Sequence, residues 1–227
     1  MTRSVLFDTE TTGLDPLQGD RVIEVACLEL ERDLPTGRHF HALIDPARDI
    51  PDDATRIHGI TTAQLRDKPR FPEIMDDLLA FLGDDPLIAH NAPFDFAFLN
   101  AEFARAGRPS LDPARMVDTL LLAKTRFPGL PNSLDALCRR FEIDLSERTS
   151  HNALLDCRLL AQVYIELTGG RQRGLELAPE STASTTEQAA SYARAASRRV
   201  VRITPTPAEL ARHAAFVARL QDPLWKA

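Results

Sequence analysis

The sequence is short of cysteine, of basic charge and of long apolar runs, and each shortage excludes a class of protein. Among 227 residues there are three cysteines, without paired spacing: Cys27, Cys138 and Cys157. We expect buried thiols there, because a disulfide framework or a zinc site needs cysteines in recurring pairs. No apolar run is as long as a membrane span, and charges interrupt the start MTRSVLFDTE, where a signal peptide is apolar. The sequence therefore predicts a cytoplasmic protein without membrane contact.

The charge is acidic as a whole but unevenly distributed. The chain has 27 Lys or Arg and 33 Asp or Glu, which gives a formal net charge of −6. Residues 171–227 contain nine basic and five acidic residues, a net of +4, so residues 1–170 carry −10. This balance argues against a broad basic surface that grips duplex nucleic acid. If the acidic part acts on nucleic acid, metal ions and a tether must supply the attraction instead.

The order of apolar patterns indicates an α/β protein. Within the first 45 residues, three alternating apolar segments separated by Gly and Pro predict an antiparallel meander of strands. After Pro51 the apolar residues recur at helical spacing, and a short apolar strand at 87–89 is followed by further helices. This order is typical of a mixed sheet flanked by helices. Residues 178–191 are small and polar, which is typical of a flexible linker.

Two acidic residues, Asp8 and Glu10, follow the apolar start of the first strand in the segment VLFDTETTGLDP. Side chains alternate along a strand, so both carboxylates share the face of Leu6. Like charges so close repel each other. Burial of a carboxylate also lowers the free energy of unfolding unless a cation or a hydrogen-bond donor pairs with it. We therefore expect a positive group beside them, although an Asp-x-Glu pair on its own is more typical of a solvated surface.

Two further acidic residues lie on apolar helix faces. Asp95 precedes Leu99 by four residues in one expected helix, and Asp156 precedes Leu160 by four in another. Each carboxylate therefore faces the core, although either one taken alone can also cap a backbone group. His151 lies five residues before Asp156, about 140° around a regular helix. The two can face one site only if the helix begins just after His151, which leaves the histidine on the preceding loop.

These residues resemble the DEDDh exonucleases, the DnaQ-like branch of the ribonuclease H-like superfamily. The segments FDTETTG, AHNAPFDFAFL and HNALLDC are similar to the three motifs of that family and occur in the same order. The resemblance covers residues 5–167 and implies an exonuclease domain over 1–170, with a mixed five-stranded sheet flanked by helices. It assigns five catalytic residues, none of them substituted: Asp8, Glu10, Asp95, His151 and Asp156.

The resemblance implies hydrolysis of phosphodiester bonds with two divalent ions. The acids agree with it, because carboxylate oxygens suit Mg²⁺ or Mn²⁺ better than thiolates would. In this scheme Asp8 bridges both ions, and Asp95 holds the second ion, partly through waters. Glu10 and Asp156 hold the ion that binds the attacking water. His151 takes the proton from that water as general base, since imidazole titrates near neutral pH.

Several residues near the motifs are candidates for binding the terminal nucleotide: Thr9, Thr11, Ile57, His58 and Asn91. The segment ATRIHGIT also resembles a stretch of the family, which implies that Ile57 and His58 line the nucleotide pocket. Thr9, Thr11 and Thr12 are candidates to offer hydroxyls or backbone N–H groups to the sugar. The alternative is that they are turn residues only. Phe94 and Phe98 offer rings for stacking on bases, but their helical spacing is more typical of a core.

Residues 171–199 are the expected linker, and they open with a short motif. The segment QRGLEL fits the Gln-x-x-Leu-x-[Leu/Phe] pattern of peptides that bind sliding clamps. In that interpretation hydrogen bonds hold Gln172, while Leu175 and Leu177 fill an apolar pocket. A pattern with so few fixed positions also arises by chance, so a clamp-binding segment and an ordinary linker are both open.

The sequence of residues 200–227 predicts a helix, and this segment is too short to form an apolar core against which the helix could pack. Thr206 and Glu209 form a capping box around Pro207 at the helix start. Apolar side chains follow in the helix and at the chain end, namely Leu210, Phe216, Val217, Leu224 and Trp225. Aromatic anchors of this kind are typical of partner surfaces, and packing against the first domain is the alternative.

The tail resembles that of the epsilon subunits of bacterial DNA polymerase III, the proofreading members of the DEDDh exonucleases. The resemblance implies a 3′–5′ exodeoxyribonuclease that releases 5′-mononucleotides from single-stranded or frayed 3′ ends. It also implies that the tail binds the polymerase (alpha) subunit, and it leaves room for a theta-like small subunit. A tether raises the local concentration at the DNA without a basic surface, which fits the acidic first domain. Two alternatives stay open: a free-standing exoribonuclease, and a mainly structural subunit that bridges polymerase and sliding clamp.

Overall fold

The structure is a computed structural model that describes residues 3–148, 150–169 and 204–219. The chain divides into two compact units, Met1–Gly174 and Leu175–Ala227. Among the described residues, no helix is both long and apolar enough to cross a membrane. Several residues of the predicted clamp-binding and polymerase-binding segments lie outside the described residues: Gln172, Leu175, Leu177, Leu224 and Trp225.

The first unit is built on a mixed five-stranded sheet in the order β3-β2-β1-β4-β5. Its strands are β1 (Arg3–Thr11), β2 (Val22–Glu31), β3 (Leu34–Leu43), β4 (Leu87–Ala89) and β5 (Met116–Asp118). Strand β2 pairs antiparallel with both β1 and β3, which confirms the predicted meander. Strand β4 runs parallel to β1, and β5 runs parallel to β4. The sheet is therefore mixed, as predicted, and β1 continues through Glu10 to Thr11.

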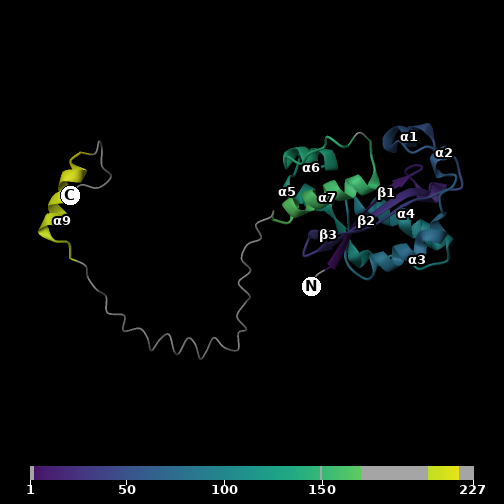
Figure 1. Cartoon of the computed structure of the whole chain (residues 1–227), viewed down its shortest axis with the longest axis horizontal. Coiled ribbons are helices and arrows are strands. Elements are labelled where there is room, and N and C mark those ends of the chain that lie inside the picture. The colour runs from purple at the N-terminus through teal and green to yellow at the C-terminus, as the bar shows by residue number, and fades with distance from the viewer. Residues whose placement is uncertain (1–2, 149, 170–203, 220–227) are drawn as a thin grey trace, which may run out of the picture. The chain divides into compact units, whose positions relative to one another are not determined.

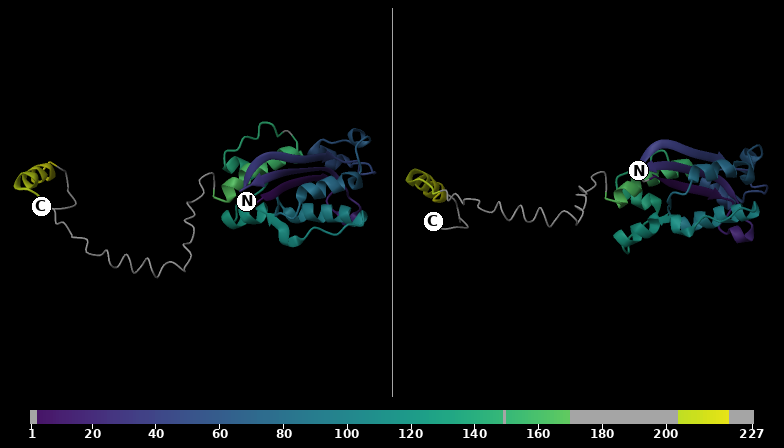
Figure 2. Two further views of the ribbon diagram at one scale, coloured as in Figure 1. Left: turned by 60° about the horizontal axis from the view of Figure 1, so that its bottom comes forward. Right: turned by 90° about the horizontal axis from the view of Figure 1, so that it is seen from below.

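Helices cover both faces of this sheet (Figures 1 and 2). Helices α3 and α4 pack on one face, and α5, α6 and α7 pack on the other. The helices of the unit are α1 (Asp52–His58), α2 (Thr62–Leu65), α3 (Phe71–Leu82), α4 (Ala92–Arg105), α5 (Thr119–Arg126), α6 (Leu134–Arg140) and α7 (Ala153–Leu167), with 3-10 turns η1 (Pro16–Gln18) and η2 (Pro113–Arg115).

Two apolar cores, one on each face of the sheet, fix the directions of the β1 side chains. Val5 and Phe7 pack into the core beneath α3 and α4, whereas Leu6 packs into the core beneath α7. The alternation of the strand then puts Asp8 and Glu10 on the side of Leu6, as the sequence predicts. All three cysteines are buried and free, which confirms that expectation.

The starts of two helices agree with the sequence analysis. Asn152 is the N-cap of α7, with its side chain accepting a hydrogen bond from the N–H of Leu155, so His151 lies on the preceding loop as predicted. In the second unit, α9 (Pro207–Val217) begins with the expected capping box. The side chains of Leu210 and Phe216 on α9 are exposed, at 55% and 59%, whereas Val217 is buried.

Candidate active site

The predicted catalytic residues come together at one cavity of about 600 Å³, a volume typical of small-molecule sites. They reach it from four segments of the chain and line it jointly: Asp8, Glu10, Asp95, His151 and Asp156. Strand β4 is parallel to β1, so α4, which follows β4, begins at the edge where β1 ends. In open α/β sheets this carboxyl edge is where ligands bind, because the connecting loops leave a crevice there.

Asp95, in the first turn of α4, is tied to the end of β1. Its Oδ1 accepts hydrogen bonds from the backbone N–H of Thr9 at 3.1 Å and from the Thr9 hydroxyl at 2.7 Å. Burial raises the pKa of Asp95 to about 7, although the hydrogen bonds from Thr9 act in the opposite direction. Thr9 thus positions the Asp95 carboxylate, a role that the sequence analysis does not assign to it.

Asp8 and Glu10 face other acids without an arginine or lysine of their own. Burial raises the pKa of the Asp8 carboxyl well above its usual value, and repulsion from Asp95 and Glu10 adds to the effect. The pKa of Glu10 rises to about 8, first through burial and then through repulsion from Glu24 and Asp156. This edge of the sheet therefore has a surplus of negative charge that a bound cation would relieve.

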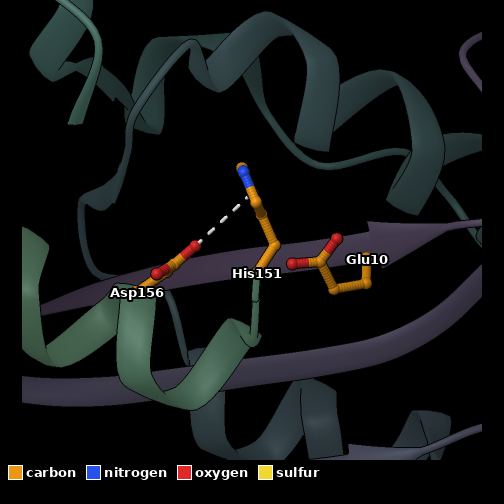
Figure 3. Close-up of side chains that lie close together, drawn as sticks. All are labelled: Glu10, His151 and Asp156. Atoms are coloured by element: carbon orange, nitrogen blue, oxygen red, sulfur yellow. Dashed lines mark ion pairs between the residues drawn. The ribbon is translucent and has the colours of Figure 1, made fainter. Parts of the chain in front are cut away.

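His151 leans over the acids from the loop before α7 (Figure 3). Its Nδ1 is 3.7 Å from Oδ2 of Asp156. One ligand atom of each of Glu10, His151 and Asp156 lies within 4.8 Å of the other two, close enough to share a metal ion. The backbone N–H of His151 donates to the carbonyl of Ile57 at 3.1 Å, so the end of α1 holds this loop, while the imidazole is half exposed.

Glu24 on β2 supports the site without lining its cavity, a role that the sequence analysis misses. It is fully buried and directly opposite Glu10 across the two strands. Its carboxylate accepts hydrogen bonds from the Asn152 side chain at 3.1 Å and from the backbone N–H of Ala153 at 3.2 Å. Glu24 thereby fastens the start of α7 to the sheet. The available signal was an acid in the otherwise apolar strand RVIEVACLEL.

Arg148 is the second residue that the sequence analysis misses, and it is the positive group expected near the acids. It lies between α6 and α7, and its guanidinium binds both oxygens of Asp156, with Nε 2.6 Å from Oδ1 and Nη2 2.7 Å from Oδ2. Its Nη1 is 2.7 Å from Oδ1 of Asp135. Nothing in the sequence separates this arginine from the many others, because the pairing depends on how the loop folds back.

Most of the predicted nucleotide-binding residues line the same cavity: Thr9, Thr11, Thr12, Ile57, His58 and Phe94. Ile57 is 53% exposed, whereas His58 is buried, and burial lowers the pKa of its imidazole. Asn91 is not among the residues that line the cavity, and its backbone N–H donates to Asp118 instead. Phe98 is fully buried in the core.

The hydroxyls of the threonine loop have partners within the protein. The Thr11 hydroxyl donates to the carbonyl of Gly13 at 2.6 Å, and the Thr12 hydroxyl is 3.2 Å from Oδ1 of Asp20. Thr12 also accepts from the N–H of Arg21 at 3.0 Å. These contacts fit the alternative that the threonines shape the turn after β1.

The donor set of the cavity fits a divalent metal ion. Its acids offer carboxylate oxygens, the ligands that Mg²⁺ and Mn²⁺ prefer. None of the described residues that line the cavity is a cysteine, because the three cysteines are buried elsewhere. Burial and repulsion from neighbouring carboxylates raise the pKa values of Asp8, Glu10 and Asp95, and a bound cation would lower them again. The residues present can therefore hold a divalent ion between β1, α4 and α7.

Comparisons with known proteins agree with the geometry. Residues 5–164 match the family model RNase_T, described as Exonuclease. The chain is 45% identical over 221 residues to DNA polymerase III subunit epsilon of Rickettsia felis, covering 96% of each chain. It is 40% identical over 178 residues to the Escherichia coli protein of that name, covering 75% of this chain and 73% of that one. A solved structure of exonuclease X with 5′-overhanging duplex DNA is 28% identical, with a TM-score of 0.57 and coverage of 74% of this chain and 91% of the other.

Proposed function

Because the chain belongs to the exonuclease family and to the DNA polymerase III epsilon subunits within it, we propose that it removes mismatched nucleotides from 3′ primer ends during replication. It is a 3′–5′ exonuclease that acts on DNA and works with a polymerase. The observation that supports this most strongly is the gathering of four carboxylates and a histidine at one cavity. A role on replicating DNA also fits the cytoplasmic location that the sequence predicts.

The acids of the cavity are proposed to hold two divalent ions, Mg²⁺ or Mn²⁺. In this proposal Asp8 would help to hold both ions, Glu10 and Asp156 would hold one of them, and Asp95 would hold the other. When bound, the ions supply positive charge that stabilises the charge developing on the phosphate and on the leaving 3′ oxygen. Thr9 keeps the Asp95 carboxylate in place, and Glu24 keeps α7 against the sheet.

His151 is proposed as the general base that takes a proton from the attacking water. Its ring is half exposed and lies beside Asp156 at the mouth of the cavity, so it can exchange that proton with solvent. An imidazole is suited to this step because its ordinary pKa is near neutral. The loop that carries it is held at its backbone by Ile57, which limits how far the ring can drift.

The cavity is proposed to take one terminal nucleotide from a single strand. Its volume of about 600 Å³ and its lining by Ile57 and Phe94 suit a sugar and a base. A paired 3′ end must first unpair, which costs a few kcal/mol, and a mismatched end has largely met that cost already. Selectivity for mismatches then follows from fraying and needs no reading of the base.

The experiment that tests this function is digestion of a labelled primer with Mg²⁺. Matched primers are compared that differ only in a paired or mismatched 3′ nucleotide, and a third primer is RNA of the same sequence. We expect faster release of 5′-mononucleotides from the mismatched DNA end and slow release from RNA. Equal rates on both DNA ends, at a temperature where the paired end stays closed, contradict proofreading. A preference for RNA favours the free-standing exoribonuclease instead.

The C-terminal part is proposed to bind the polymerase alpha subunit, with residues 1–170 as an independent exonuclease. The exposed side chains of Leu210 and Phe216 on α9 offer an apolar surface for this contact. A chain that ends at Gly170 is expected to digest frayed primers at close to the full rate but not to co-elute with alpha. Undiminished binding of the shortened chain contradicts the tail assignment.

Phe216→Ala tests the same surface within the full chain. We expect it to weaken the complex with alpha about tenfold or more, since truncation of a buried anchor costs over about 1.4 kcal/mol. His213→Ala is the matched control, because His213 is exposed on the same helix. The tail is proposed to include Val217, Leu224 and Trp225 as further contacts.

The remaining partners are a sliding clamp and a theta-like small subunit. The clamp is proposed to bind residues 172–177 through Gln172, Leu175 and Leu177. A pull-down with purified clamp, comparing the full chain with Leu175→Ala, tests this contact. A theta-like subunit is tested by co-expression with the full chain and co-purification.

A further inference from the structure

The guanidinium of Arg148 contacts two side chains of the active site, Asp156 and His151. These are the proposed metal ligand and the proposed general base. It binds both carboxylate oxygens of Asp156, at 2.6 and 2.7 Å, and the two side chains are only 9% and 5% exposed. Its Nη2 also lies 3.3 Å from Nδ1 of His151. A guanidinium can only donate, so this contact uses the lone pair of Nδ1, which is the ring atom that faces Asp156.

Arg148 is also the only arginine or lysine among the described residues at this place. A second cavity, of about 300 Å³, adjoins the first and shares Asp8, His151 and Asp156 with it. Among the described residues that line the two cavities, only Arg148 is a lysine or arginine. Among the described residues of these two cavities, the acids therefore outnumber the one permanent cation, and that cation is paired with a proposed metal ligand.

The same guanidinium has a second anchor that does not belong to the catalytic set. Its Nη1 is 2.7 Å from Asp135 on α6, whose side chain is 38% exposed. Arginine has five N–H donors in a fixed fork, so it can leave one carboxylate and keep the other. Release from Asp156 therefore does not require release from Asp135.

We propose that Arg148 competes with the divalent metal for Asp156. In the metal-free protein the guanidinium occupies Asp156 and Nδ1 of His151, and metal binding moves it onto Asp135 alone. The proposal rests on the proposed function, because it takes Asp156 as a metal ligand. Arg148 acts through Asp156 and His151 and is a positioning residue: it keeps a crowded acidic site folded before metal arrives and sets how tightly metal is held.

The test is titration of the full chain with Mn²⁺, followed by the electron paramagnetic resonance of the free ion, without nucleic acid. Arg148→Gln is expected to bind Mn²⁺ about tenfold more tightly and to melt at a lower temperature without metal. An arginine that merely orients a bound ligand gives the opposite sign, a loss of about 10- to 100-fold in affinity. A loss, or an unchanged affinity, overturns the proposal.

Arg21→Gln is the matched control. Arg21 binds both oxygens of the buried Glu102, at 2.6 and 2.8 Å, but lines neither cavity. It is expected to lower the melting temperature and to leave Mn²⁺ affinity unchanged. If Arg148→Gln does not fold, Arg148→Lys takes its place, since lysine keeps the charge but cannot grip both oxygens. Its Mn²⁺ affinity is expected to exceed that of the wild type, and an equal or lower affinity overturns the proposal.

Two further variants separate this proposal from the proposed function. Asp135→Asn removes the second anchor and is expected to weaken Mn²⁺ binding in the wild-type chain, with a clearly smaller effect in the Arg148→Gln chain. Equal effects in both chains contradict the exchange of partners. Asp156→Asn is expected to weaken Mn²⁺ binding strongly. Unchanged binding there means that Asp156 is not a metal ligand, which is a failure of the proposed function itself.

Discussion

Acidic residues near the two ends of strand β1 are in opposite electrostatic settings: Glu29 on the adjacent β2 lies near its start, and Asp8 and Glu10 lie at its end. At the start, Arg3 donates to the buried Glu29 with Nε at 2.7 Å, and this hydrogen bond keeps the pKa of Glu29 below its usual value. At the end, burial and neighbouring carboxylates raise the pKa values of Asp8 and Glu10. Glu10 even stands opposite Glu24 on the adjacent strand, a like-charge pair that destabilises a sheet.

Two buried carboxylates that serve the fold have an arginine beside them, since Arg3 pairs with Glu29 and Arg21 with Glu102. At the end of β1 the carboxylates outnumber the cations, which costs stability. This unfavourable arrangement fits the proposed function, in which a cation from solution binds there.

The largest expected effect comes from Asp8→Asn at the acidic end of β1. Loss of a group proposed to contact both ions removes several kcal/mol of charge stabilisation, so hydrolysis should fall by about 10⁴-fold or more. Without metal, the melting temperature of the variant should equal or exceed that of the wild type, because the repulsion between Asp8 and the neighbouring carboxylates is removed. Primer digestion and thermal melting with EDTA measure the two effects. A near-normal rate contradicts the assignment of Asp8 to the metals.

His151→Gln should have the next largest effect on turnover. Removal of a general base typically lowers the rate by about 10²- to 10⁴-fold. A higher pH should partly restore the rate, because hydroxide then replaces the missing base, and Mn²⁺ affinity should change little. His39→Gln, on the exposed strand β3, is the control and should digest primers normally. A variant that loses Mn²⁺ binding instead makes His151 a ligand.

The pH dependence of stability should differ between the metal-free and metal-bound protein. The folded-state pKa values of Glu10 and Asp95, about 8 and about 7, lie above their ordinary values of 4.5 and 3.8. The folded state then binds more protons than the unfolded state between roughly pH 4 and 8. The contribution of these two groups to the free energy of unfolding is therefore complete at the acidic end of this range, and it is lost as the pH rises through the range. Melting scans in EDTA should fall by about 3 °C or more from pH 5 to pH 8. Saturating Mg²⁺ should flatten this slope, and a slope unaffected by Mg²⁺ contradicts the account.

Glu29→Gln, at the neutralised end of β1, should have the smallest effect on activity and a moderate one on stability. It removes the charge that Arg3 and Arg38 bind, at 2.7 and 2.9 Å. Loss of hydrogen bonds to a charged group costs about 1.5 kcal/mol or more, which is about 3 to 6 °C for a chain of this size. Primer digestion should stay normal. A large loss of activity means that this end is part of the functional site as well.

Local patterns in the sequence predict the meander and the directions of several acidic side chains, whereas the set of five catalytic residues comes from the family resemblance. Alternation with period two predicts the meander and the shared face of Asp8 and Glu10, and it does so because one face of each strand is buried. The spacing of five residues between His151 and Asp156 predicts that α7 begins between them, because two side chains so spaced on a regular helix cannot face the same site. These predictions depend on neighbours in the chain, and the structure confirms them.

The remaining features depend on contacts between segments that are far apart in the sequence. Glu24 reaches the site only because the turn between β1 and β2 sets a register that puts it opposite Glu10. Arg148 reaches Asp156 only because its loop folds back onto α7. Thr9 is predicted as a substrate contact, yet its hydroxyl holds Asp95, a partner 86 residues away. No periodicity or motif contains such pairings.

The most direct test of the central claim is diffraction from crystals grown with Mn²⁺, with anomalous differences collected to locate the ions. The account predicts two anomalous peaks beside Asp8, one of them against Glu10 and Asp156, and no peak at Glu29. We also expect the Arg148 guanidinium to have left Asp156 and to remain on Asp135. Crystals with full Mn²⁺ occupancy elsewhere and none at Asp8 would contradict the claim that the surplus charge at the end of β1 is a metal site.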